Sequence, residues 1–158
     1  MIQNKINFDN EFSLKERLII KSIEHFCRPK VYPNFLNNLL ETRSNKKIKR
    51  IGCTDSSDGL FQALQDLANA SKCKAILNYE KIPKDKDWPK GDKWDEYYFF
   101  GGEDYELVFS LPKKWAKSLS KLDKDINEIG LFTYGEPSIE FTDSNKNKLL
   151  NKKPFKHF

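Results

Sequence analysis

The sequence of 158 residues has little of the material from which disulfide-stapled, zinc-binding or membrane-spanning proteins are built. It contains three cysteines, Cys27, Cys53 and Cys73, no C-x-x-C pair and only two histidines, which argues against a disulfide framework and a structural zinc site. No apolar run approaches the roughly 20 residues of a membrane span. Residues 1–12 lack the apolar stretch of a secretory signal. We therefore expect a cytoplasmic chain with ordinary free thiols and no membrane partner.

Positive charge is only slightly in excess: the chain has 28 basic and 23 acidic residues, which gives a net charge of +5. The basic clusters at 46–50 and 146–156 lie beside Asn and Ser residues. We interpret both clusters as solvated loops and expect no nucleic-acid partner. Aromatic residues, at 13% of the chain, argue against disorder because they can form a core that offsets chain entropy.

Apolar spacing and turn residues predict an α+β fold, a mixed sheet with helices. A capping box at Ser13–Glu16 predicts a helix that ends at Arg28. Further helices are expected over 34–42, from Asp58 to about residue 70, and over 113–122. Strands are expected over 48–53, 74–80, 105–111 and 139–142. The segment 83–96 is expected to be a long loop, with its tryptophans packed against the sheet rather than stacked on bases.

The segment Asp55-Ser56-Ser57-Asp58-Gly59-Leu60 stands where a predicted strand leads into a helix. Two carboxylates with hydroxyls between them suit a hard cation that prefers oxygen ligands. The helix start attracts phosphate oxygens, and a glycine lets a ligand or a neighbouring backbone come close. The alternative interpretation is structural, with Asp58 as the N-cap and both serines as turn residues.

A second segment, Gly101-Gly102-Glu103-Asp104-Tyr105-Glu106-Leu107, places paired glycines ahead of two adjacent acids and a predicted strand. On a strand, Glu103 and Asp104 would point to opposite faces and could not share one role. The alternative is a glycine turn followed by a solvated strand entrance. Neither segment is a Walker loop, because GxxxxGK[ST] does not occur in the sequence.

In this order and at this separation, D-x-S-D-G-L and G-G-E-D-Y-E-L resemble thiamine-monophosphate kinase, a family of the aminoimidazole ribonucleotide synthetase superfamily. Supporting matches are Arg28-Pro29, Ile129-Gly130 followed by Gly135, and an aromatic residue before His157-Phe158. The resemblance covers residues 26–158 and leaves 1–25, an arm and a helix, unmatched. It corresponds to the C-terminal half of such a kinase, so the N-terminal metal- and ATP-binding domain is expected to be absent from this chain.

The resemblance implies an α+β domain like the C-terminal domain of aminoimidazole ribonucleotide synthetase and the ATP-dependent phosphorylation of thiamine monophosphate to thiamine diphosphate. It implies that Asp55 and Asp58 bind Mg2+ and that Ser57 contacts ATP. Glu103 in the first place, or Asp104, would contact the thiamine phosphate, and Phe155 would pack on the thiamine rings. Ser56 departs from the family pattern, in which an apolar residue is common at this position. No catalytic general base is assigned.

Two other functions remain open at this point. One is a sister enzyme of the same superfamily, against which the Tyr105-Glu106-Leu107 ending of the second motif argues. The other is a non-catalytic remnant that binds a nucleotide or a partner protein. The resemblance also implies a homodimer for the full-length protein. The isolated chain is expected to be inactive, because two aspartates supply too few ligands for even one Mg2+.

Overall fold

A computed structural model describes residues 51–151 together with Glu16, which is helical. The expected elements over 14–28 (apart from Glu16) and 34–42 lie outside the described residues, as do Cys27, Phe155 and both histidines. The described elements are β1 (Gly52–Asp55), α3 (Leu60–Ser71), β2 (Lys74–Leu77), η1 (Tyr79–Lys81), α4 (Asp92–Phe100), β3 (Leu107–Ser110), α5 (Lys113–Leu122), β4 (Gly130–Thr133), β5 (Ser138–Phe141) and η2 (Ser144–Asn151). None of the helices in this part of the chain is long and apolar enough to cross a membrane.

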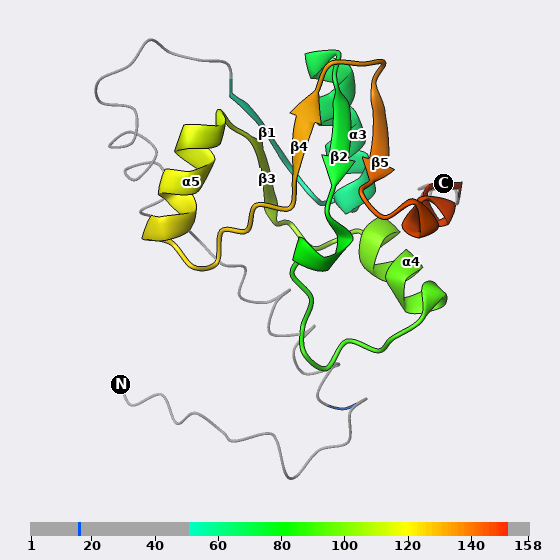
Figure 1. Ribbon diagram of the computed structural model, residues 1–158. Helices are drawn as coiled ribbons and strands as arrows, with labels where there is room; N and C mark the ends of the chain where they lie inside the picture. Colours follow the sequence, from blue (N-terminus) through cyan, green and yellow to red (C-terminus); the bar gives the residue numbers. More distant parts are fainter. Residues whose placement is uncertain (1–15, 17–50, 152–158) are drawn as a thin grey trace, which may run out of the picture.

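The strands form two small sheets, and α3 packs on strands of both (Figure 1). In the first sheet, β1 pairs antiparallel with β3. In the second, β2 lies at the centre, antiparallel to β4 and parallel to β5. The pairing of parallel and antiparallel strands confirms the mixed sheet and the α+β class expected from the sequence.

Helix α3 forms the centre of the core because its apolar residues recur at helical spacing. It buries Ala63, Leu64, Leu67 and Ala68, whereas Ala70 near its end is exposed. The partly buried Phe61 extends this face and packs its ring 4.9 Å from that of Phe100 on α4. The first motif thus leads directly into the helix that holds both sheets together.

The largest difference from the expected elements lies in 83–96. The expected loop ends at Gly91, and α4 begins at Asp92. The helix was not predicted because the segment is rich in Lys, Asp and Trp and shows no apolar periodicity. Only Asp95, Phe99 and Phe100 of α4 are buried. The expected packing of the tryptophans does not hold for Trp94, which is exposed; the aromatic residues of α4 that join the core are Phe99 and Phe100. Strand β4 and the 3-10 segment η2 were not predicted, and β2 ends at Leu77, before the predicted Glu80.

A charged cluster at Asp95 joins α4 to the loop that contains Lys84 and to η2, which contains Lys146. Asp95 is only 7% exposed, and its two carboxylate oxygens accept hydrogen bonds from Lys84 at 2.9 Å and Lys146 at 3.2 Å. Both ammonium groups lie over the ring of Tyr79, 4.0 and 3.9 Å from its centre. Lys146 is therefore no solvated loop lysine, and the interpretation of the basic cluster at 146–156 is wrong at this residue.

Burial raises the pKa of Asp95, but hydrogen bonds from Tyr79, Lys84 and Lys146 outweigh burial and leave the pKa below its usual value. Asp95 is consequently ionised at neutral pH. The carboxylate lies between two cations, which is the condition under which a buried charge is tolerated.

Candidate functional site

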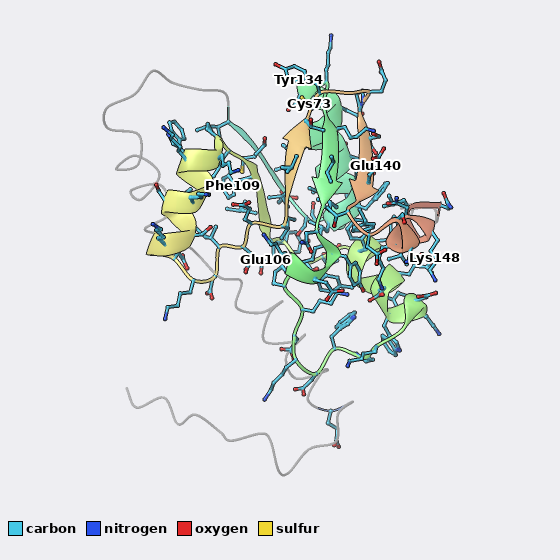
Figure 2. All side chains as sticks on the ribbon, viewed as in Figure 1. Cys73, Glu106, Phe109, Tyr134, Glu140 and Lys148 are labelled. Carbon is cyan, nitrogen blue, oxygen red and sulfur yellow. The ribbon has the colours of Figure 1, made fainter. Side chains whose placement is uncertain are left out.

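The two sequence motifs meet at the end of the β1–β3 pair. Ser56 N–H donates to the Glu106 carbonyl at 2.9 Å, and Glu103 N–H donates to the Ser57 carbonyl at 2.8 Å. Glu106, which lies directly before β3 and is labelled in Figure 2, donates its own N–H to Ser56 Oγ at 3.0 Å. Three hydrogen bonds therefore hold residues 56–57 against residues 103–106.

Glycines allow the two loops to approach this closely. A Cβ atom added at Gly102 would lie 2.5 Å from the Ser57 carbonyl oxygen. Gly59 has a φ of 93°, and a Cβ there would lie 2.9 Å from the Gly101 carbonyl oxygen. The expectation that Gly59 admits a neighbouring backbone is confirmed, and the neighbour is the second motif itself.

We expect Gly102→Ala to push the two loops apart and to destabilise the chain by about 1–3 kcal/mol, as overpacking against an unyielding backbone does. The measurement is urea unfolding of the 158-residue chain, with the Glu103 amide followed by NMR. Loss of its protection should accompany the loss of stability. An alanine variant with wild-type stability would show that the loops do not touch at Gly102.

Asp55 is an exposed carboxylate at the end of β1 that is fixed by its neighbour. Its Oδ1 accepts the Ser57 hydroxyl at 2.6 Å and the Ser57 N–H at 3.1 Å. These two hydrogen bonds hold the pKa of Asp55 below its usual range, and the bond from the hydroxyl has the larger effect. Asp55 is therefore an anion with one fixed oxygen, and this favours metal binding over proton transfer.

Asp58 is not the N-cap of α3. The cap is Gly59, whose carbonyl accepts the first helical hydrogen bond from Ala63 N–H at 3.1 Å. The capping alternative for Asp58 is therefore wrong. Asp58 is exposed and lies in the turn that closes with the bond from Gly59 N–H to the Ser56 carbonyl.

The acids of the second motif do not lie on a strand, because β3 begins only at Leu107. The opposite-faces argument for Glu103 and Asp104 therefore does not apply. Glu103 and Tyr105 adopt left-handed backbone with φ of 69° and 51°, a conformation that costs energy outside glycine and is found at functional sites. The Tyr105 hydroxyl donates to Glu103 Oε2 at 2.5 Å. Glu103 is thus held by two neighbours, through its backbone by Ser57 and through its carboxylate by Tyr105.

The site is strongly acidic. The pKa of Tyr105 is raised chiefly by its hydrogen bond to Glu103 and further by the charges of Glu103, Asp55 and Asp58. Burial raises the pKa of Tyr98 on α4 to about 12, with contributions from Asp104 and Glu106. The phenol of Tyr105 in the second motif and that of Tyr98 on α4 thus both lie in the negative field of these carboxylates. Phosphate groups would be repelled here unless a cation lay between.

The carboxylates fit a hard cation only in part. Within 51–151, no three His, Cys, Asp or Glu side chains gather closely enough to hold a metal ion. Asp55 at the end of β1 and Asp58 in the turn that follows are both exposed, and each can offer a carboxylate oxygen. The other oxygen ligands that Mg2+ requires would come from water, phosphate groups or other protein segments. Phe155 lies outside the described residues, so its proposed packing on a substrate stays a prediction.

The contacts that Ser56 and Tyr105 make in the candidate site were not predicted from the sequence. Ser56 was interpreted as a turn residue, yet it is 2% exposed and bonded to the second motif. No local pattern reveals a hydrogen bond to a residue fifty positions away. For Tyr105, the only indication in the sequence of its contact with Glu103 is that the two residues are two positions apart.

Comparison with known proteins identifies the family. No protein-family model matches the chain. A thiamine-monophosphate kinase of Prochlorococcus marinus is 34% identical over 123 residues, covering 78% of this chain and 37% of that protein. One of Nitrosopumilus maritimus is 33% identical over 150 residues, covering 91% of this chain and 45% of that protein. The chain belongs to the thiamine-monophosphate kinase family. It spans less than half the length of these two relatives.

Solved structures of thiamine-monophosphate kinases share the fold. A structure described as AaThiL complexed with AMPPCP and TMP matches with a TM-score of 0.57 and 25% identity, over 83% of this chain and 43% of the other. A thiamine-monophosphate kinase from Stenotrophomonas maltophilia K279a matches with a TM-score of 0.54 and 19% identity, over 82% of this chain and 46% of the other. The likeness confirms the α+β fold expected for a thiamine-monophosphate kinase domain.

Proposed function

We propose that this chain forms the part of a thiamine-monophosphate kinase that contacts metal and substrate during ATP-dependent formation of thiamine diphosphate. The observation that carries the proposal is the meeting of the two motifs, which presents Asp55, Asp58 and Glu103 on one pair of loops. Relatives named thiamine-monophosphate kinase and a neighbour described with AMPPCP and TMP support it. The sister-enzyme alternative has no such support.

The proposed roles follow from the chemistry of the donor atoms. Asp55 and Asp58 would hold Mg2+, which when bound offsets the repulsion between the phosphate groups of the two substrates. Ser57 Oγ donates to Asp55 in the structure, so a hydrogen bond to an ATP phosphate would require it to exchange partners. Glu103, with Asp104 beside it, would contact the thiamine phosphate, and Phe155 would pack on the thiamine rings.

The reaction requires positioning more than covalent assistance from protein groups. An oxygen of the thiamine monophosphate phosphate forms a bond to the γ-phosphorus of ATP, and the bond from that phosphorus to the bridging oxygen breaks. ADP leaves with the electron pair. The attacking oxygen is already anionic, so no side chain of this chain needs to remove a proton.

Because the relatives are more than twice as long as the matched region, we propose that this chain corresponds to their C-terminal half. A further domain would then supply the missing aspartates, most ATP contacts and a homodimer interface. Dependence on ATP favours a cytoplasmic location.

The direct test is an assay of the full-length protein with ATP, Mg2+ and thiamine monophosphate, in which thiamine diphosphate is quantified. We expect turnover that depends on all three components. No thiamine diphosphate at high enzyme concentration would refute the kinase proposal and leave the non-catalytic remnant as the better interpretation.

We expect the isolated 158-residue chain to fold but not to catalyse. Folding follows from its own apolar core around α3. Catalysis should fail because two aspartates leave Mg2+ loosely held, and the second set of ligands is missing. Calorimetric titration with Mg-ATP should show a Kd in the high micromolar range or weaker. Tight binding, or thiamine diphosphate made by the isolated chain, would contradict this expectation.

A further inference from the structure

We infer that Ser56 is a positioning residue that keeps Glu103 in register with Asp55 and Asp58. This inference rests on the proposed function, since it assigns the site a coupling between its metal-binding loop and its substrate-binding loop. Ser56 is 2% exposed, and apart from Asp95 it is the one buried polar residue within the described part of the chain.

The strand register places Ser56 opposite Glu106. Asp55 on β1 pairs with Leu107 on β3, so the next pair along the antiparallel ladder is Ser56 with Glu106. Two residues of a hydrogen-bonded antiparallel pair ordinarily exchange both of their N–H to carbonyl bonds. Only one of those bonds is made here, from Ser56 N–H to the Glu106 carbonyl at 2.9 Å.

The second bond of the pair is made by a side chain. Glu106 N–H donates to Ser56 Oγ at 3.0 Å, while the Ser56 carbonyl turns away and accepts Gly59 N–H at 2.9 Å. The hydroxyl therefore replaces the backbone carbonyl as the acceptor. This replacement lets the chain turn out of β1 toward α3 and still remain bonded to the second motif.

Glu103 depends on this arrangement. Its N–H donates to the carbonyl of Ser57, the residue after Ser56, and Ser57 in turn fixes Asp55. Without a hydroxyl at position 56, the Glu106 N–H would lose its acceptor in a part-buried place, which is costly. The loop from Glu103 to Glu106 would then separate from the Asp55–Asp58 turn.

Amide hydrogen exchange of the 158-residue chain tests the coupling without any ligand. We expect Ser56→Ala to speed exchange at the Glu103 and Glu106 amides at least tenfold, with the amides of α3 unchanged. Ser56→Cys, nearly the same size but a weaker acceptor, should give an intermediate acceleration and serves if the alanine variant does not fold. The matched control is Ser120→Ala, which loses a part-buried hydroxyl bond to the Ala116 carbonyl on α5 and should leave both amides unchanged.

Steady-state kinetics of the full-length kinase distinguish a positioning role of Ser56 from a purely structural one. Ser56→Ala should raise the KM for thiamine monophosphate about tenfold while the KM for ATP stays within twofold. A purely structural role would lower the active fraction, and hence the apparent kcat, without this split. Glu103 exchange within twofold of wild type in both Ser56 variants would overturn the inference, as would equal KM values. Absence of kinase activity in the wild-type protein would instead refute the proposed function, and the exchange experiment would then decide the coupling alone.

Discussion

Replacing Asp55 by Asn in the full-length kinase is expected to lower turnover more than about a hundredfold, above the loss seen when only a neighbour of a metal ligand is changed. The amide has nearly the shape of the carboxylate, and its oxygen can still accept both hydrogen bonds from Ser57. The fold should therefore survive. What is lost is the negative charge that would hold Mg2+ between the phosphate groups. Steady-state kinetics over a range of Mg2+ concentrations measure the effect.

Asp58→Asn should behave in the same way, because its structural role as a helix cap is excluded by the cap at Gly59. Asp66→Asn is the matched control. Asp66 is also an exposed aspartate, it lies on α3, and it accepts a hydrogen bond from Gln62 at 2.8 Å. Its replacement should leave turnover unchanged. Wild-type activity in both Asn variants of the motif would refute the metal-binding role.

The pH profile offers an independent check on Asp55. Its pKa lies below the usual value because the charged form accepts the bonds from Ser57. The carboxylate therefore stays ionised as the pH falls through the ordinary aspartate range near 3.9. We expect no loss of turnover from protonation of Asp55 above about pH 4.

Replacing Asp95 by Asn is expected to have the largest effect on stability, about 2–3 kcal/mol. The change leaves the Lys84 and Lys146 ammonium groups over the Tyr79 ring without the anion between them. Loss of one partner of a buried ion pair costs about 3–5 kcal/mol, and we expect less here because both lysines are about a quarter exposed, at 22% and 25%. Urea unfolding of the 158-residue chain at pH 7 measures the loss.

Asp92→Asn on the same helix provides the control. Asp92 pairs with Lys148 at 3.1 Å, but both side chains are more than 60% exposed, so the expected loss is below about 1 kcal/mol. Similar losses for the two variants would refute the role of the Asp95 cluster in joining α4 to η2.

The contribution of Asp95 should also depend on pH with a defined sign. Its folded pKa is lowered, so the stabilisation is present in full above the unfolded value near 3.9 and is lost as the pH falls through the folded pKa. The difference between wild type and Asp95→Asn should therefore shrink progressively below about pH 5. A difference that grew on acidification would show that the folded pKa is raised instead.

Local sequence patterns were sufficient where a helix has a clear apolar face. Helix α5 occupies 113–122 as predicted, since Trp115 and Leu119 recur four residues apart and are both buried. The segment Asp55–Leu60 likewise lies at the strand-to-helix junction that was predicted for it. Helix α4 was missed because tertiary contacts, rather than apolar periodicity, stabilise it. One such contact is the Asp95 cluster, whose partners come from two other segments of the chain.

The sequence by itself determined the family and the α+β class and singled out the acidic residues of the candidate site, because those follow from short motifs and from spacing along one element. Only the tertiary structure decided how the acids are arranged. In the structure the cap of α3 is Gly59 rather than Asp58, Glu103 and Asp104 precede the strand, and the buried Ser56 is hydrogen-bonded to Glu106. The physical reason is that these properties depend on strand pairing between residues about fifty positions apart, and no local preference of either segment encodes that pairing.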